Sequence, residues 1–202
     1  MSDLEPKRRL RIFCALELPE DVRARVAAHV AHLRAAAESS LKISWERAEK
    51  LHLTLKFLGE VEAGRVESLA RAAERAAEGA CKFEVSLGES GAFPPRGNPR
   101  VLWLGLQDVT GQLARLQARL EAECERENFP RDARPFRPHI TIARIRAANA
   151  AARHVAALHR ETEFTPATFD VGEFVIMQSQ LGTHGSRYTT LSRHELKAGT
   201  GG

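Results

Sequence analysis

A chain of 202 residues with 43% hydrophobic side chains can bury the core of one domain, or of two tightly joined lobes, without disulfide or metal support. It has no N-terminal apolar segment ending in a small-residue cleavage site and no run near the roughly 18 apolar residues of a membrane span, so we expect a cytoplasmic protein. The formal net charge of +4 is compatible with an anionic partner such as RNA or a nucleotide phosphate. However, Arg and Glu alternate over 65–78 and 115–127, which is typical of a solvated helix face.

The elements expected from hydrophobic periodicity alternate between strand and helix. Prolines, glycines and polar stretches separate them, and Gly59 is expected to end the second strand. The strands are expected at residues 10–18, 51–59, 83–87, 101–106, 138–144, 164–180 and 187–196, and the helices at about 20–33, 66–79, 113–124 and 147–158, with a short apolar segment at 41–45 and a loop at 88–99.

Hairpins that lie between helices favour an antiparallel α+β fold over a doubly wound parallel sheet. The strand at 101–106 is apolar on both faces and should be central. We therefore predict a single domain over 1–202, built from two intertwined lobes that face each other across a cleft. Its glycine-rich tail, about 197–202, should be disordered.

Three cysteines, Cys14, Cys81 and Cys124, are an odd number spread over apolar or helical surroundings. This pattern argues against a disulfide framework and against a clustered metal site. We expect reduced, partly buried thiols.

Two short segments share one pattern and are the main clue to function. Residues 52–55 read His-Leu-Thr-Leu and residues 139–142 read His-Ile-Thr-Ile. Since residues two apart on a strand point the same way, His52 should share a face with Thr54, and His139 with Thr141. The apolar residues between them should pack beneath. One such histidine has little meaning, but two copies on strand-like segments indicate one site built from two halves.

The other histidines carry no such pattern. His29 should pack at the edge of an apolar helix stripe and His32 should be exposed, while His154 and His159 should lie at the surface of the last helix.

A pair of facing histidines suits displacement at phosphorus. One imidazole takes a proton from the attacking oxygen and the other donates a proton to the leaving oxygen, because imidazole titrates near neutral pH. Thr54, Thr141 and Arg144 are the right kinds of group to stabilise charge on the phosphoryl oxygens.

A metal site with His52 and His139 as ligands is the rival chemistry. Catalytic zinc requires three protein ligands, and neither motif brings a carboxylate, a cysteine or a second histidine at ligand spacing. We therefore expect no metal and no other cofactor.

The paired motifs resemble those of the 2H phosphoesterase superfamily, and the chain is similar to its RNA 2′,3′-cyclic phosphodiesterases, historically called 2′-5′ RNA ligases. The similarity extends over nearly the whole chain, in blocks at residues 11–19, 51–59, 91–94, 100–105, 138–144 and 178–181 and at Tyr188.

The resemblance implies a bilobal, pseudo-symmetric fold, with the motifs on two facing antiparallel sheets and the helices packed outside. It implies metal-independent hydrolysis of an RNA terminal 2′,3′-cyclic phosphate to a 2′-phosphate, with weak 2′-5′ ligation in reverse. His52 would be the general acid and His139 the general base, and Thr54 and Thr141 would hold phosphate oxygens. Arg144 would add charge stabilisation or stack on the terminal base. We expect a monomer that acts on RNA ends or nucleotides and not on membranes.

Strict alternation conflicts with two of these assignments. It places Phe57 on the face opposite His52, and Arg144 on the face opposite His139. A twist, a bulge or a strand end must turn both side chains towards the cleft. For Phe57, a base platform and a core residue remain alternatives, and Phe13 is expected to belong to the core.

Two other functions stay open. The chain could bind nucleotides or RNA ends without turnover, although binding alone would not require two proton-transfer groups. It could also hydrolyse a small cyclic nucleotide, since the sequence does not define substrate size.

Overall fold

The computed structural model describes residues 8–37, 42–146, 149–182 and 185–198, and within them it contains one curled antiparallel sheet with four α-helices. The strands are β1 (Arg9–Glu17), β2 (Ile43–Trp45), β3 (His52–Glu62), β4 (Phe83–Phe93), β5 (Val101–Gln107), β6 (His139–Ile145), β7 (Ala167–Val171), β8 (Glu173–Gly182) and β9 (Gly185–Glu195). The helices are α1 (Glu20–Ala36), α2 (Val66–Glu78), α3 (Gln112–Arg126) and α4 (Ala150–Glu161), with short 3-10 turns η1 (Ala48–Lys50) and η2 (Ala63–Arg65).

The sheet has two halves, which we call the first and the second lobe. The strand order is β7-β4-β5-β6-β3-β1-β8-β9, with β2 paired to β6. The first lobe comprises β1, β3, β8 and β9, and the second comprises β2 and β4 to β7. A single antiparallel pair, Leu53 with Ile140, joins β3 to β6 and so joins the lobes. The two sheets expected from the sequence are therefore halves of one sheet, and the predicted α+β class is confirmed.

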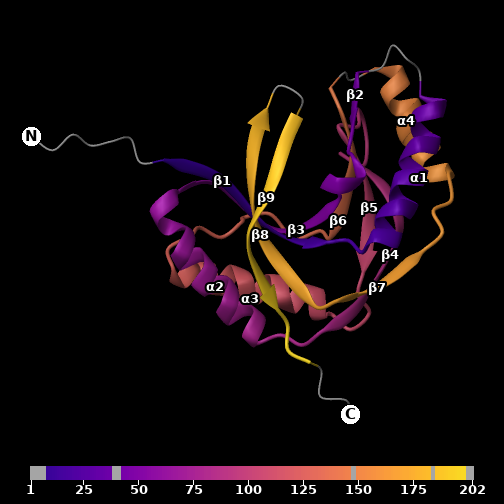
Figure 1. The fold of residues 1–202 in the computed structure, drawn as a ribbon. Coiled ribbons are helices and arrows are strands. Elements are labelled where there is room, and N and C mark those ends of the chain that lie inside the picture. The colour runs from indigo at the N-terminus through magenta and orange to yellow at the C-terminus, as the bar shows by residue number, and fades with distance from the viewer. Residues whose placement is uncertain (1–7, 38–41, 147–148, 183–184, 199–202) are drawn as a thin grey trace, which may run out of the picture.

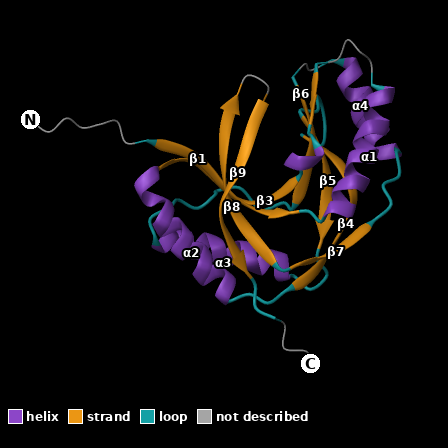
Figure 2. Cartoon of the chain, in the orientation of Figure 1, coloured by secondary structure: helices purple, strands orange, loops and turns teal. Residues whose placement is uncertain are grey.

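The helices cover the outer side of the curled sheet in two pairs (Figures 1 and 2). Helix α2 packs on α3, and α1 packs on α4. Small side chains allow α2 to pack closely on α3 and the sheet. The buried face of α2 includes Leu69, Ala72, Ala73, Ala76 and Ala77. One large apolar core lies between these helices and the sheet. No helix of the described segments combines the length and the apolarity that crossing a membrane requires.

Several strands end at other residues than expected. Glycines that were expected to end strands lie in or beside β-bulges, and hydrogen bonding to the neighbouring strand continues past them. Gly59 does not end β3. It has a φ of 70° next to the unpaired Leu58, so it accommodates a bulge, and the strand continues to Glu62. Strand β4 likewise runs on past a bulge at Gly88 to Phe93, where a loop was expected.

The segment predicted as one strand over 164–180 is two strands separated at Gly172. Strand β7 pairs with β4 in the second lobe, whereas β8 pairs with β1 in the first. The chain thus crosses between the lobes at this glycine. The end of the chain is also more ordered than expected, because Lys197 exchanges backbone hydrogen bonds with Ala80 and Lys82. The predicted disorder of 199–202 lies outside the described residues.

The cysteines and three of the peripheral histidines follow the expectation. Cys14 and Cys124 are buried and Cys81 is half-buried, as expected, and none of the three is in a disulfide. His29 is buried at the edge of the α1 stripe, while His32 and His154 are exposed.

His159 contradicts the prediction of a surface residue, because it is fully buried. Its Nε2–H donates to the Trp103 carbonyl at 2.9 Å, so its Nδ1 is the acceptor for His29 Nε2–H at 3.2 Å. The helical spacing of Ala152, Val155, Ala156 and His159 on one buried face was the signal for this position.

The His29–His159 pair should make folding sensitive to acid. Burial, and the neighbouring His159, lower the pKa of His29 from 6.5 to about 4. The pair therefore contributes stability above pH 6.5 and loses it as the pH falls from 6.5 towards 4, by about 3 kcal/mol for His29. Urea unfolding at pH 7 and pH 4.5 should show a smaller loss for His29→Gln than for the wild type. His32→Gln, an exposed change on the same helix, should behave like the wild type. An equal loss in His29→Gln would contradict this coupling.

Candidate functional site

The two motifs meet where the lobes join. Leu53 and Ile140 form the pair that links β3 to β6, and each follows the histidine that begins its strand. Leu53, Leu55, Ile140 and Ile142 are buried in the main core. The opposite face of the sheet, which carries His52, Thr54, His139 and Thr141, is called the inner face below. The predicted sharing of one face within each motif is therefore seen in the structure.

Both imidazoles are held in the same way. Nδ1–H of His52 donates to the Lys50 carbonyl at 2.7 Å, and Nδ1–H of His139 donates to the Arg137 carbonyl at 2.7 Å. A carbonyl oxygen can only accept, so the tautomer of each neutral ring is fixed with its proton on Nδ1. Nε2 of each ring is left as the nitrogen that can accept or donate a proton on the inner face.

Aromatic rings pack around His52 from the first lobe. The Phe13 ring lies 4.8 Å and the Tyr188 ring 5.4 Å from the His52 ring, centroid to centroid. Phe13 is buried, as expected of a core residue, but it packs with Ala15, Val175 and Met177 in a small apolar cluster on the inner face, separate from the main core. In this place the Phe13 ring also restricts the imidazole.

The second lobe restricts His139 in the same manner. The rings of Phe93 and Trp103 lie 5.1 Å and 6.4 Å from it. Gly91 is paired with Trp103, and a Cβ at Gly91 would lie 2.1 Å from the indole, so glycine is required for the ring to occupy this place. Sequence reasoning missed this role of Trp103, since its strand is apolar on both faces.

A β-bulge in each motif resolves the conflict over Phe57 and Arg144. In the pairing of β3 with β1, Thr54 lies opposite Ala15 and Lys56 opposite Cys14, so Leu55 is an extra residue. Strand alternation restarts after it. Phe57 consequently returns to the inner face opposite Phe13 and is 43% exposed. The core alternative for Phe57 is therefore wrong.

The second motif repeats the bulge at the equivalent residue. Trp103 lies opposite Thr141 and Leu102 opposite Ala143, which leaves Ile142 unpaired. Arg144 is thereby turned to the inner face, where its side chain is 60% exposed and its Nε lies 3.7 Å from a Glu46 oxygen. The structure thus brings all six predicted site residues to one face.

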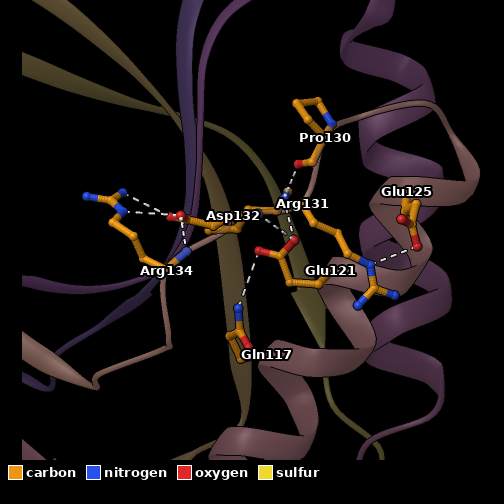
Figure 3. A network of polar contacts seen from close by, with 8 residues as sticks. Gln117, Glu121, Glu125, Pro130, Arg131, Asp132 and Arg134 are labelled. Carbon is orange, nitrogen blue, oxygen red and sulfur yellow. Dashed lines mark hydrogen bonds and ion pairs between the residues drawn. The ribbon is translucent and has the colours of Figure 1, made fainter.

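The same bulge turns Lys56 towards the helices. Its Nζ is buried and donates to Glu121 at 2.6 Å and to the Pro130 carbonyl at 2.8 Å. Glu121 also accepts from Gln117 and from the backbone N–H of Asp132 (Figure 3). The segment after Pro130 leads to the Arg137 carbonyl, so this network anchors the approach to His139. Ala143 occupies the equivalent position in the second motif.

The pKa values of His52 and His139 are shifted by partly different neighbours. Burial lowers the pKa of both, and the nearby Arg144 lowers both further, while the backbone carbonyl bonds oppose this effect. The His139 ring also lowers the pKa of His52, whereas Glu17, paired with His52 across β1 and β3, raises it. No carboxylate of the described residues acts on the pKa of His139 in this way. His52 is therefore the ring with a carboxylate nearby, although the pKa of both rings is lowered overall.

The described residues contain no group of three or more His, Cys, Asp or Glu side chains that could hold a metal ion. The polar groups gathered on the inner face are imidazole, hydroxyl and guanidinium. These groups can transfer protons and stabilise an anion.

The chain has relatives of known family in both sequence and structure. The family model of the 2′-5′ RNA ligase superfamily matches residues 19–183. The RNA 2′,3′-cyclic phosphodiesterase of Archaeoglobus fulgidus is 32% identical over 183 residues, which cover 90% of this chain and 98% of that protein. A crystal structure of a Thermus thermophilus protein superposes with a TM-score of 0.76 at 28% identity, covering 94% of this chain and 99% of the other. Escherichia coli LigT complexed with 3′-AMP has a TM-score of 0.72 at 30% identity, with the same coverage.

Arg144→Gln should raise the pKa of both His52 and His139, because it removes a cation that disfavours their charged forms. An NMR titration of the imidazole Cε1–H signals, assigned with His52→Gln and His139→Gln, measures both values. Arg100→Gln, which removes a charge from the same lobe, should have a smaller effect. Unchanged midpoints in Arg144→Gln would show that this guanidinium does not act on the pair.

Lys56→Met should destabilise the fold by about 3–5 kcal/mol, because it leaves the buried Glu121 carboxylate without its charge partner. Urea unfolding measures this loss, and adding Glu121→Gln should recover part of it. Arg126→Gln, at an ion pair whose arginine is 70% exposed, is the control and should cost less than about 1 kcal/mol. A cost as small as the control's would mean that the network does not anchor the segment.

Proposed function

Because the chain belongs to the 2′-5′ RNA ligase superfamily, we propose that it hydrolyses the terminal 2′,3′-cyclic phosphate of RNA to a 2′-phosphate, without a metal ion. The family resemblance predicted from the sequence is thereby confirmed. The observation that carries the proposal is the pair of imidazoles on adjacent strands, each with Nδ1 held by a carbonyl and Nε2 left for proton transfer. Relatives named RNA 2′,3′-cyclic phosphodiesterase support the reaction class.

The reaction requires one base and one acid on opposite sides of the phosphorus. His139 Nε2 removes a proton from water as the water oxygen bonds to phosphorus. The bond from phosphorus to O3′ breaks, and His52 Nε2–H gives its proton to O3′. The products are a free 3′-hydroxyl and a 2′-phosphate. His139 ends protonated and His52 neutral, and exchange with solvent restores both.

Burial lowers the pKa of both imidazoles, and their neighbours differ. A general base must be neutral at the start, which suits His139, whose pKa burial lowers. A general acid must carry a proton, and at His52 the Lys50 carbonyl and, to a smaller extent, Glu17 partly oppose the lowering of the pKa by burial. The negative charge of the bound cyclic phosphate would favour a protonated His52 further.

The remaining groups on the inner face would position the substrate. Thr54 and Thr141 would donate hydroxyl hydrogen bonds to the non-bridging oxygens, and Arg144 would stabilise the charge that develops on them. Phe57 offers an exposed ring for the terminal base, with the Arg11 guanidinium 4.9 Å from its centroid on one face. The complex of LigT with 3′-AMP supports a nucleotide as the occupant.

The same geometry would support weak ligation. If a 5′-hydroxyl takes the place of water, His139 removes its proton and a 2′-5′ linkage forms as O3′ leaves. No ATP is needed, because the strained cyclic phosphate supplies the driving force. We further propose that the protein acts in the cytoplasm as a monomer.

Two alternative functions remain to be distinguished. One is a nucleotide or RNA-end binding module without turnover, and the other is a phosphodiesterase for a small cyclic nucleotide. The paired proton-transfer groups favour an enzyme over a binding module, since binding alone needs no imidazole with a fixed tautomer.

The direct test uses a short RNA that ends in a 2′,3′-cyclic phosphate, incubated with the protein in EDTA. The wild type should form a 2′-phosphate, identified by mass and by phosphatase sensitivity. His52→Ala and His139→Ala should each lower turnover by roughly two to four powers of ten, the usual value of a general acid or base.

Each departure from this result has a definite meaning. A loss of less than tenfold in either variant would contradict paired acid and base catalysis. Activity abolished by EDTA and restored by zinc would support a metal mechanism. Binding of RNA without product would support the binding module, and neither binding nor product would point to a smaller cyclic phosphate.

A further inference from the structure

Positive charge is segregated in the sequence of the second lobe. Residues 90–107 and 133–160 contain eight arginines and no lysine, aspartate or glutamate. The first segment includes β5, and the second includes β6, with His139, and α4. The net charge of the whole chain is only +4, so this segregation is not a property of the overall composition.

Three of these arginines lie together at the end of β6. Arg144 is in β6, Arg146 follows the strand, and Arg100 precedes β5, and all three are exposed. The Arg100 guanidinium donates to the Arg146 carbonyl at 3.0 Å, and the Arg100 carbonyl accepts from Ile145 at 2.8 Å. Arg100 and Arg146 are therefore held together just beyond Arg144, where β6 ends at the edge of the second lobe.

Two further arginines line a small cavity at the same end of the lobe. The cavity has a volume of about 130 Å³ and lies between the loop that follows β4 and helix α4. Arg153 and Arg160, two helical turns apart on α4, contribute to its wall beside Pro94 and Pro99, and no carboxylate does. Arg153 also donates to Asn98 of the loop at 2.9 Å. This loop begins immediately after Phe93, whose ring contacts His139.

The first lobe differs in the charge beside its histidine. On strand β1, Glu17 lies opposite His52 and binds the Arg193 guanidinium, which Glu173 also contacts. Arg193 there is paired with two carboxylates, whereas Arg144 of the second lobe has, among the described residues, only the Glu46 carboxylate beside it, at 3.7 Å. An anionic chain that starts at the two histidines is therefore attracted towards the second lobe.

We propose that Arg100, Arg146, Arg153 and Arg160, which we call the arginine edge, bind the backbone phosphates of the RNA that precedes the cyclic phosphate. This inference rests on the proposed function and adds the substrate's form to it: a chain of several nucleotides, not a mononucleotide. The surface reads charge and not sequence, because guanidinium binds any phosphate. Affinity for a chain should then fall with salt, with a slope of about −0.7 per phosphate contact for a single strand.

The test compares kcat/KM for two substrates, a ten-nucleotide RNA with a 2′,3′-cyclic phosphate and a 2′,3′-cyclic mononucleotide, at about 50 and 200 mM salt. The double variants are Arg100→Gln with Arg146→Gln, and Arg153→Gln with Arg160→Gln. Both double variants should lower kcat/KM for the RNA roughly tenfold at the lower salt. The slope of log kcat/KM against log salt concentration should become less negative by about 1.4, since two phosphate contacts are removed. Activity on the mononucleotide should stay within about twofold.

A matched control is Arg71→Gln with Arg119→Gln, which removes two exposed charges from α2 and α3. It should leave both activities unchanged. The inference is overturned if the double variants and the control lower RNA turnover equally, or if RNA and mononucleotide decline together. If the wild type hydrolyses neither substrate, the proposed function fails instead. The two failures are thus distinguishable.

Discussion

A single backbone pair, Leu53 with Ile140, is the point on which the site depends. Because β3 and β6 run antiparallel through this pair, the histidine that begins each strand is delivered to the join between the lobes. The buried leucine and isoleucine fix the register, since a slip of one residue would exchange the core and inner faces. The carbonyls of Lys50 and Arg137 then fix the rings. The two imidazoles are thus positioned by strand pairing and two short hydrogen bonds.

The repeated bulge gives the two halves of the site different side chains on the inner face. After Leu55 and Ile142, alternation restarts, and both lobes place a side chain from the third position after the threonine on the inner face. In the first lobe that residue is Phe57, an aromatic ring. In the second it is Arg144, a cation that acts on both histidines. Pseudo-symmetry of the backbone therefore coexists with a difference at this one position, a ring in the first lobe and a guanidinium in the second.

Local pattern was sufficient to predict most elements, the α+β class and the two histidine motifs, because period-two and helical spacing are properties of neighbouring residues. It could not place Phe57, because a bulge depends on the partner strand and leaves no mark in the motif. Helical spacing marked His159 as a buried position, but the groups that satisfy its ring, His29 and the Trp103 carbonyl, lie on other elements and leave no local mark. The division of 164–180 at Gly172 also depended on pairing, since β7 and β8 join different lobes.

The central claim is that both imidazoles act on one phosphorus atom through Nε2. A crystal structure of the protein with a nucleoside 2′-phosphate, the product of the proposed reaction, tests it most directly. The account predicts phosphate oxygens, or O3′, within about 2.6–3.2 Å of Nε2 of both His52 and His139. Both Nδ1 atoms should keep their bonds to the carbonyls of Lys50 and Arg137. A phosphate in contact with only one histidine, or bound away from both, would contradict the account.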